Sequence, residues 1–330
     1  MANNLKKIFI TGGAGYVGSM LTPYLAKKGF EVTVYDLMMY GRDVIEPHSN
    51  INIIEGDIRD KELLRDSIKG HDAVIHLACI SNDPSFELNP DLGKSINLDS
   101  FEPLVKISKD LKVRRFIYAS SSSVYGVKNE RNVHEDMALE PLTDYSKFKA
   151  DCEVILSKYN SKEFTTVTLR PATVCGYSTR QRLDVVVNIL SNLAFHKRKI
   201  TVFGGDQLRP NIHINDMIRA YEHILEELDE KISNKIFNVG FENHTVMELA
   251  NATKQVIGDD VELLLTPTND NRSYHISSNK IRNELGFETK FTVEDAVNDL
   301  KNAFEKDLLP NSLEDEKYFN IKRMNSIKLT

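Results

Sequence analysis

The stretch YSKFK, residues 145–149, places a tyrosine and a lysine four residues apart, where a helix would present both on one face. A tyrosine hydroxyl has a pKa of about 10 and is a poor base at neutral pH. The ammonium group of Lys149 beside Tyr145 would favour the phenolate, which could then remove a proton from a hydroxyl group. The alternative is an amphipathic helix with an exposed lysine. Lys147 lies two residues from Tyr145 and faces away, as a surface charge would.

A second stretch, ITGGAGYVG, follows the first apolar run at once and contains four glycines, Gly12, Gly13, Gly15 and Gly18. A Cβ atom in such a turn would hold a pyrophosphate away from the backbone amides at the start of a helix. Asp36 ends the next apolar run at the distance expected for a carboxylate that binds the adenosine ribose. That carboxylate would repel a 2′-phosphate, so the predicted cofactor is NAD rather than NADP. The alternative is an ordinary tight turn between strand and helix.

Both stretches belong to a chain that alternates short apolar runs with segments of helical periodicity. The predicted strands are 7–11, 31–36, 50–57, 72–78, 114–120 and 164–170, and the predicted helices are 16–28, 60–69, 94–110 and 144–160. Because the strands are apolar throughout, they indicate a parallel sheet covered by helices on both faces. We predict an α/β fold with a Rossmann-type doubly wound parallel sheet, in which ligands bind at the carboxyl ends of the strands.

The pattern is looser after about residue 170, which predicts a second, smaller lobe. Helices are expected at 184–197 and 215–228, a short strand and turn at 200–206, and a further strand at 235–240. We predict an NAD-binding domain over 1–170, to which 211–243 returns, and a discontinuous α/β substrate-binding lobe made of 171–210 and 244–330. The charged stretch from Leu313 onward is either a packed arm or a loose tail.

The composition indicates a small-molecule partner. The chain has 330 residues, 41% of them hydrophobic, and its net charge is −6 with acidic and basic residues interspersed. No basic face is evident, so neither nucleic acid nor a membrane surface is an expected partner. No run approaches the ~20 apolar residues of a membrane span. The nine histidines form no HxxxH or Cys/His cluster, and we expect no metal.

The three cysteines, Cys79, Cys152 and Cys175, are an odd number without CxxC spacing. Such a set fits reduced thiols better than a disulfide framework, so we expect a cytoplasmic protein.

The sequence resembles the extended short-chain dehydrogenases/reductases, in the branch of nucleotide-sugar epimerases, dehydratases and reductases. The stretches that carry the resemblance are TGGAGYVG (11–18), Asp36, GDIRD (56–60), HLA (76–78), SSSSVYG (120–126), YSKFK (145–149), LRPATVCG (169–176) and RPNIHINDM (209–217).

The resemblance implies which residues contact NAD. They are Gly12, Gly15, Tyr16, Val17, Gly18, Asp36, Asp57, Ile58, Leu77, Ala78, Asn97, Ser120, Tyr145 and Lys149. Asp57 and Ile58 would flank the adenine, and Asn97 would support Lys149 through a water. The alternatives are an ordinary turn for Asp57 and a helix-surface amide for Asn97.

The serine run, residues 120–123, identifies the third catalytic candidate and reduces the number of reactions that the sequence favours. In family members of the form Ser/Thr-x-x-Val-Tyr-Gly, the hydroxyl partner of the tyrosine lies three residues before the valine, which is Ser121 here. Sugar 4,6-dehydratases carry Asp-Glu next, and the 3,5-epimerase/reductases carry a cysteine acid where Ser123 stands. Ser122 and Ser123 have no useful pKa for those proton transfers.

We therefore expect an NAD-dependent enzyme that epimerises a nucleotide sugar through transient oxidation at C4. The alternative is a nucleotide-sugar C4 dehydrogenase or reductase with tightly bound NAD(H), acting for example on a GDP-linked hexose or heptose. A 4,6-dehydratase and a non-catalytic NAD-sensing regulator are further alternatives.

The resemblance also implies a substrate side and a partner. The candidates for contacts with the nucleotide-diphosphate sugar are Ser121, Ser122, Thr173, Arg180, Arg182, Val202, Phe203, Arg209 and Arg272. For Arg209 and Arg272, which would bind the diphosphate, the alternative is a surface ion pair. Arg180 and Arg182 could contact phosphate, base or sugar, or be surface arginines. In this family a homodimer would form through helices 94–110 and 144–160.

Overall fold

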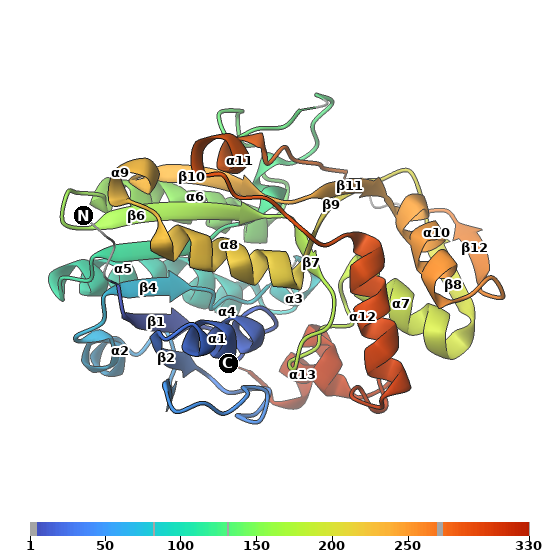
Figure 1. The fold of residues 1–330 in the computed structure, drawn as a ribbon, viewed down its shortest axis with the longest axis horizontal. Coiled ribbons are helices and arrows are strands. Elements are labelled where there is room, and N and C mark those ends of the chain that lie inside the picture. The colour runs from blue at the N-terminus through green and yellow to red at the C-terminus, as the bar shows by residue number, and fades with distance from the viewer. Residues whose placement is uncertain (1–4, 82, 131, 269–272, 330) are drawn as a thin grey trace.

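The computed structural model describes residues 5–81, 83–130, 132–268 and 273–329. Its centre is a parallel sheet of seven strands in the order β10-β6-β5-β4-β1-β2-β3 (Figure 1). These strands are β1 (Lys7–Thr11), β2 (Glu31–Asp36), β3 (Ile51–Glu55), β4 (Ala73–His76), β5 (Arg115–Ala119), β6 (Thr165–Pro171) and β10 (Lys235–Val239). The order reverses between β1 and β4, and in such sheets the crevice at this point, beyond the carboxyl ends of the strands, is where ligands bind.

Helices cover both faces of the sheet. One face packs against α1 (Gly18–Lys27) and α8 (Ile214–Glu226), and the other against α2 (Lys61–Ile68), α5 (Phe101–Asp110) and α6 (Asp144–Tyr159). In β1, Ile8 and Ile10 point into the first core and Phe9 into the second. Successive side chains of a strand point to opposite faces, so a strand buried on both faces has to be apolar at every position.

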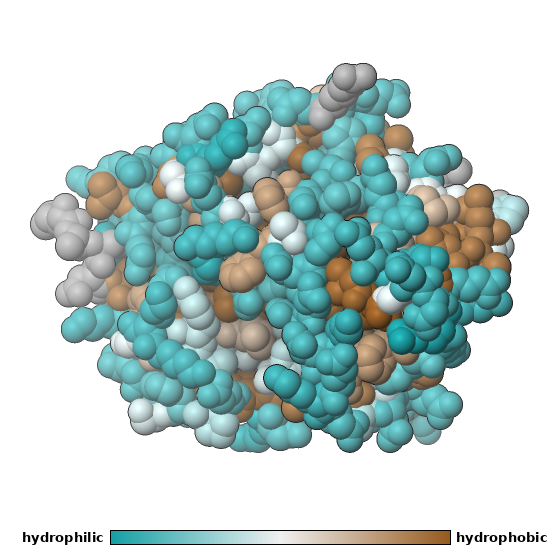
Figure 2. Space-filling model, turned by 45° about the vertical axis from the view of Figure 1, so that its right-hand side comes forward, coloured by the Kyte–Doolittle hydropathy of each residue, from teal (hydrophilic) through white to brown (hydrophobic). Residues whose placement is uncertain are grey.

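The second lobe has a separate core. Helices α7 (Val186–Lys197), α10 (Val246–Ile257) and α12 (Val293–Glu305) pack beside a two-stranded sheet of β8 (Lys199–Phe203) and β12 (Glu262–Thr266). A three-stranded sheet of β11 (Glu242–Thr245), β9 (Leu208–His213) and β7 (Thr173–Cys175) lies between the lobes (Figure 1). Short helices α9 (Asp229–Ile232) and α11 (Asn279–Leu285) lie beside β6 and β10. Hydrophilic residues cover most of the face shown in Figure 2, with hydrophobic residues in smaller areas between them.

The predicted fold class is confirmed, and the strand at 235–240 joins the main sheet beside β6. The boundaries between the two lobes stay a prediction.

One predicted element differs from the structure. The helix expected over 94–110 is divided into α4 (Pro90–Lys94), a π-helical turn (Ser95–Asp99) and α5. Pro103 lacks the N–H that a continuous helix would need to bond the carbonyl of Asp99. The chain is therefore free to form the wider turn, and π turns are frequent at functional sites.

The stretch after Leu313 forms a packed arm, which resolves the alternative left open by the sequence. It contains a short 3₁₀ helix (Glu316–Tyr318) and α13 (Asn320–Ser326), with Tyr318 and Met324 buried. Within the described ranges, no helix is long and apolar enough to cross a membrane.

Candidate active site

A cavity of about 350 Å³ lies at the carboxyl ends of the strands, at the point where the strand order reverses. It brings together most of the residues that the sequence singled out. These are Gly12, Gly15, Tyr16, Val17, Gly18, Asp36, Ile58, Leu77, Ala78, Ser120, Ser121, Ser122, Tyr145, Lys149, Thr173, Arg180 and Arg182. Residues from the loop after β1 and from the polar segment after β7 thus share one cavity.

The glycine loop between β1 and α1 is packed so closely that three of its glycines, Gly12, Gly13 and Gly18, have no room for a side chain. Gly12 has φ +75°, and a Cβ atom there would lie 2.5 Å from the backbone nitrogen of Ala78. A Cβ atom on Gly18 would lie 2.4 Å from the carbonyl oxygen of Gly12. On Gly15 it would meet only that same oxygen, at 3.2 Å, and Gly15 lines the cavity. The loop is therefore a cradle that a side chain at Gly15 would partly fill.

This difference predicts two distinct outcomes for alanine substitutions in the loop. Gly15→Ala is expected to leave the melting temperature close to that of the unchanged protein and to lower NAD affinity on the order of tenfold, because the added methyl group displaces amide contacts worth about 1 kcal/mol each. Gly18→Ala is expected to destabilise the fold itself. Nucleotide released on denaturation, together with thermal unfolding, measures both effects. Undiminished NAD content in Gly15→Ala would contradict the cradle.

The start of α1 is available to an anion. The N-cap residue Val17 has no side-chain hydrogen bond to the helix, and the cavity-lining loop residues lie directly before it. The first backbone N–H groups of a helix carry a partial positive charge and bind phosphate readily. The loop and helix thus fit the pyrophosphate of a dinucleotide.

Asp36, at the end of β2, connects the glycine loop to the next turn. Its Oδ2 accepts a hydrogen bond from the Ala14 N–H at 3.0 Å, and its Oδ1 accepts one from the Met38 N–H at 2.9 Å. Burial raises the pKa of Asp36, although these two hydrogen bonds oppose the rise. The carboxylate is therefore held rigidly at the rim where a ribose hydroxyl would have to bind.

Tyr145 and Lys149 lie on the first turns of α6, which begins with a capping box between Thr143 and Ser146. The Lys149 ammonium group lies 5.9 Å from the centre of the Tyr145 ring. It donates a hydrogen bond to the carbonyl oxygen of Ala119 at 2.6 Å, and only 5% of the residue is exposed. The lysine is thus fixed beside the tyrosine by the end of β5.

His76 lies near the ammonium group without adding a second charge. Burial, and to a smaller extent the charge of Lys149, lowers the pKa of His76 to about 3. Its Nδ1 is 2.7 Å from the Oγ1 of Thr11. The imidazole is neutral at physiological pH, so Lys149 supplies the positive charge next to Tyr145.

The four serines begin where β5 ends and have different surroundings. Ser121 caps a 3₁₀ turn (Ser122–Tyr125), and its Oγ lies 2.8 Å from the Oγ of Ser123. Ser120 donates a hydrogen bond to the carboxylate of Glu153 beneath the cavity. Ser121 is the N-cap residue of a fixed turn and lines the same cavity as Tyr145.

A buried ion pair, Arg170 with Glu153, supports the end of β5. The Arg170 guanidinium forms two hydrogen bonds with the Glu153 carboxylate, at 2.6 and 3.0 Å, and donates another to the Tyr125 hydroxyl at 2.7 Å. Both charged residues are almost fully buried. Burial opposes the charge of Arg170, but Glu153 raises the pKa of Arg170 above its ordinary value. The serine run therefore rests on a rigid polar network.

The predicted substrate side is only partly assembled at the cavity. Arg209 stacks over the ring of Tyr274, with 5.5 Å to its centre, and it is Tyr274 that lines the cavity. Val202 is fully buried in the core of the second lobe, and Phe203 is 58% exposed on β8. Neither residue lines the cavity, and their contact with the nucleotide-diphosphate sugar stays a prediction. Arg272 lies outside the described residues.

Two of the predicted cofactor residues, Asp57 and Asn97, have their side chains bonded to other residues of the protein. The Asp57 carboxylate pairs with Arg59, at 2.6 Å, and this hydrogen bond lowers the pKa of Asp57. The Asn97 amide lies in the π-helical turn and bonds both the N–H and the carbonyl of Ile80, at 2.8 and 2.9 Å. Asn97 thus holds Ile80, which lines the cavity, whereas neither Asp57 nor Asn97 lines it, and their contacts with NAD stay a prediction.

Sequence reasoning missed several polar residues that line the cavity, among them Tyr40, Ser81 and Asn320. Asn320 belongs to the C-terminal arm, and its side chain is hydrogen-bonded to Tyr40, Ser81 and Arg180. No spacing in the sequence connects these four positions, so only the fold brings them together.

Comparison with known proteins identifies the family. The model of the NAD dependent epimerase/dehydratase family matches residues 8–240, which is more than half of the chain. The chain therefore belongs to this family, and the resemblance to extended short-chain dehydrogenases/reductases and the prediction of NAD as cofactor are confirmed.

Relatives of different activity resemble the chain to a similar degree. A UDP-glucose 4-epimerase from Lactobacillus helveticus is 27% identical over 88% of this chain and 94% of its own length. The low-salt glycan biosynthesis protein Agl12 of Haloferax volcanii is 26% identical, over 88% and 96%. A dTDP-D-glucose 4,6-dehydratase from Dictyostelium discoideum is 29% identical, over 72% of this chain and 58% of its own.

A solved structure agrees with the fold. The UDP-glucose 4-epimerase of Thermotoga maritima, determined with UDP-glucose, superposes with a TM-score of 0.83 at 25% identity and covers 92% of this chain and 99% of its own. These relatives place the chain among NAD-dependent nucleotide-sugar epimerases and dehydratases, and the particular reaction is a separate question.

Proposed function

We propose that the protein is an NAD-dependent nucleotide-sugar epimerase that acts by transient oxidation at C4 of the sugar. The observation that carries the proposal is that Ser121, Tyr145 and Lys149 line one cavity with the glycine loop and Asp36. The similarity to two UDP-glucose 4-epimerases over nearly their full length supports it.

The roles follow from the positions of the side chains. Tyr145 removes the proton of the C4 hydroxyl, and the nearby Lys149 charge stabilises the phenolate. Ser121 holds the sugar oxygen by a hydrogen bond. The glycine loop and Asp36 would hold NAD, which would supply the acceptor for hydride from the same carbon and the donor for its return. Epimerisation then requires the C4 ketone to present its other face before the hydride returns.

The serine run argues against dehydration. Loss of water from a sugar needs an acid and a base near the neighbouring carbons, and the residues after Ser121 are Ser122 and Ser123. The second candidate is a C4 dehydrogenase or reductase acting on a GDP-linked hexose or heptose, because the same three residues would serve it.

The test is to denature the purified protein, identify the released nucleotide and its redox state, and then supply UDP-, GDP-, CDP- and dTDP-sugars while following products by NMR. The expected result is bound NAD that is not consumed and a C4 epimer of one substrate. Accumulation of free keto-sugar with stoichiometric NADH would replace the epimerase by the dehydrogenase, and a 4-keto-6-deoxy product would establish the dehydratase.

Two further proposals concern the cellular location and the oligomeric state of the enzyme. The three cysteines are unpaired, which supports a cytoplasmic location.

We also keep the homodimer through α5 and α6 as a proposal, although Val154 is the only large apolar side chain exposed on these two described helices. Light scattering in solution measures the oligomeric state, and a monomer would remove this proposal.

A further inference from the structure

The C-terminal arm, residues 315–329, crosses the cavity from one lobe to the other. On the second lobe, the carbonyl of Tyr318 accepts a hydrogen bond from the Leu183 N–H at 2.9 Å. On the first lobe, Arg323 donates to the carbonyl of Met39 at 2.7 Å, and Met324 packs into the core between the sheet and α5. Asn320, Met324 and Leu329 line the cavity. The arm is therefore a wall of the ligand site.

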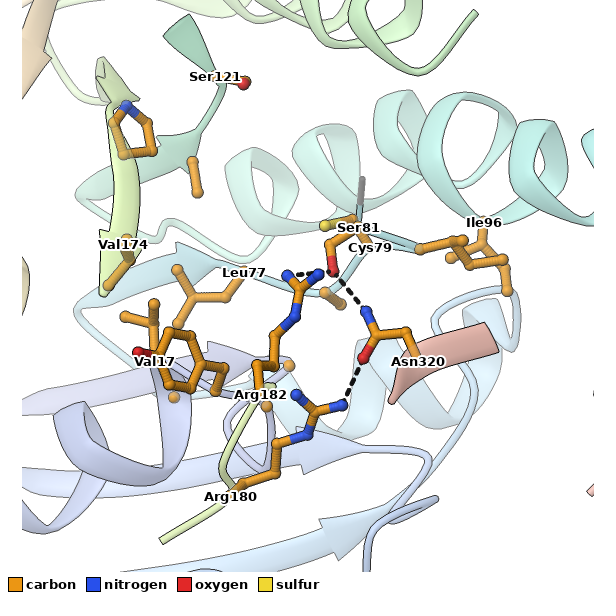
Figure 3. Close-up of a pocket in the computed structure, with 18 of the residues that line it drawn as sticks. Val17, Leu77, Cys79, Ser81, Ile96, Ser121, Val174, Arg180, Arg182 and Asn320 are labelled. Carbon is orange, nitrogen blue, oxygen red and sulfur yellow. Dashed lines mark hydrogen bonds between the residues drawn. The ribbon is translucent and has the colours of Figure 1, made fainter. Parts of the chain in front are cut away.

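Asn320 joins two arginines of the other cavity wall (Figure 3). Its Oδ1 accepts a hydrogen bond from Arg180 Nη2 at 2.5 Å, and its Nδ2 donates to the Oγ of Ser81 at 3.1 Å. The same Ser81 Oγ accepts a hydrogen bond from Arg182 Nη1, also at 3.1 Å. The four side chains form a continuous chain of hydrogen bonds, so the arm fixes both guanidinium groups at the cavity.

The two arginines have more donors than the protein uses. Arg180 is 4% exposed and Arg182 is 9% exposed. Within the described part of the chain, Arg180 Nε and Arg182 Nη2 are buried without a hydrogen-bond partner. Asp184 balances one of the two positive charges, through a hydrogen bond of 2.8 Å from Arg182 Nε. Buried cationic donors without acceptors are unfavourable, and an anion with several oxygens would satisfy them.

We propose that the C-terminal arm completes a diphosphate-binding site, in which Asn320 positions Arg180 and Arg182 over the diphosphate of the bound dinucleotide. The arm thereby closes over the cofactor and holds it. Asn320 acts through the two arginines and is a positioning residue. The inference concerns cofactor binding and is independent of which sugar is converted.

The places of the arginines favour the dinucleotide over the sugar nucleotide. Arg180 stacks on Tyr40, 3.6 Å from the ring centre, and its charge acts on Asp36, at the adenosine end of the predicted site. Arg182 lies within electrostatic reach of Tyr145, where the sugar is oxidised. Arg180 and Arg182 therefore lie between the predicted site of the adenosine ribose and the site where the sugar is oxidised. The glycine loop lines the same cavity. In a dinucleotide the diphosphate lies between these two sites.

The substitution that tests the site is Asn320→Asp, which is nearly isosteric and places a carboxylate between the two guanidinium groups. Part of their charge is then neutralised, and a diphosphate is repelled. The matched control is Asn325→Asp, the same change at an exposed position of the same helix. The readouts are the exchange rate of bound nucleotide against labelled NAD, and the affinity for UDP by calorimetry.

We expect Asn320→Asp to exchange NAD at least tenfold faster than the unchanged protein, with UDP affinity unaltered, and Asn325→Asp to stay within twofold in both. An unaltered exchange rate in Asn320→Asp would overturn the proposal. Weaker UDP binding with unaltered NAD exchange would overturn the assignment to the dinucleotide, since the diphosphate would then be that of the sugar nucleotide. Neither readout depends on turnover, so failure of the epimerase proposal is seen separately.

A second measurement needs no variant. Binding and closure are thermodynamically linked, so NAD that is covered by the arm has to protect the arm. Trypsin cleavage at Lys322, Arg323 and Lys328, followed by mass spectrometry, is expected to be at least fivefold slower with saturating NAD than in nucleotide-free protein, and unchanged by UDP alone. Equal cleavage rates with and without NAD would overturn the closure of the arm over the cofactor.

Discussion

Replacement of Tyr145 by phenylalanine is expected to lower turnover by about 10²- to 10⁴-fold, the usual range for loss of a positioned general base. Only the hydroxyl group is removed. The capping box of Thr143 and Ser146 still begins α6, and Lys149 keeps its hydrogen bond to Ala119. The protein should therefore stay folded with NAD bound, and the loss should appear in kcat. Product formation by NMR and the nucleotide content after denaturation measure the two effects.

Tyr159→Phe is the matched control for this substitution. Tyr159 ends the same helix, and its hydroxyl donates a hydrogen bond to Glu102 at the surface, 2.8 Å away. Its loss is expected to leave turnover within a factor of two. If Tyr145→Phe retained more than a tenth of the turnover, another group would have to remove the proton, and the role assigned to Tyr145 would be refuted.

The parts of the site that could be predicted from the sequence are those fixed by local structure. Tyr145 and Lys149 are one helical turn apart, so a helix at this position is enough to bring them together. The glycine loop lies between β1 and α1, and its function depends on backbone geometry within a few residues. Asp36 ends β2, directly beside β1 in the sheet. Each of these contacts follows from neighbouring elements whose periodicity is visible in the sequence.

The contacts made by the C-terminal arm could not be predicted in this way. Asn320 is 140 residues from Arg180 and 239 residues from Ser81, and the three meet only because the arm crosses both lobes. Val202 and Phe203 show a second reason why part of the site could not be predicted from the sequence. The strand was predicted correctly, but its pairing with β12 in a separate sheet was not, and the alternation along β8 then buries Val202 and exposes Phe203.

Arg170→Met is expected to have the largest effect on stability, about 3–5 kcal/mol of the free energy of unfolding. Arg170 is 2% exposed and forms two hydrogen bonds with Glu153, which is 5% exposed. Methionine fills much of the volume but leaves the Glu153 carboxylate without its cation. Denaturant unfolding measures the loss. Because Ser120 is bonded to the same carboxylate, turnover should fall as well.

The double variant Arg170→Met with Glu153→Leu separates the lost charge balance from the lost packing. A buried ion pair costs desolvation of both partners, so replacing both by apolar residues is much less harmful than removing one. Ser120 and Tyr125 each lose a partner in the double variant, which keeps part of the destabilisation. We therefore expect the double variant to be more stable than Arg170→Met alone. A double variant of equal or lower stability would mean that Arg170 stabilises the strand end by packing, and that its pairing with Glu153 contributes little.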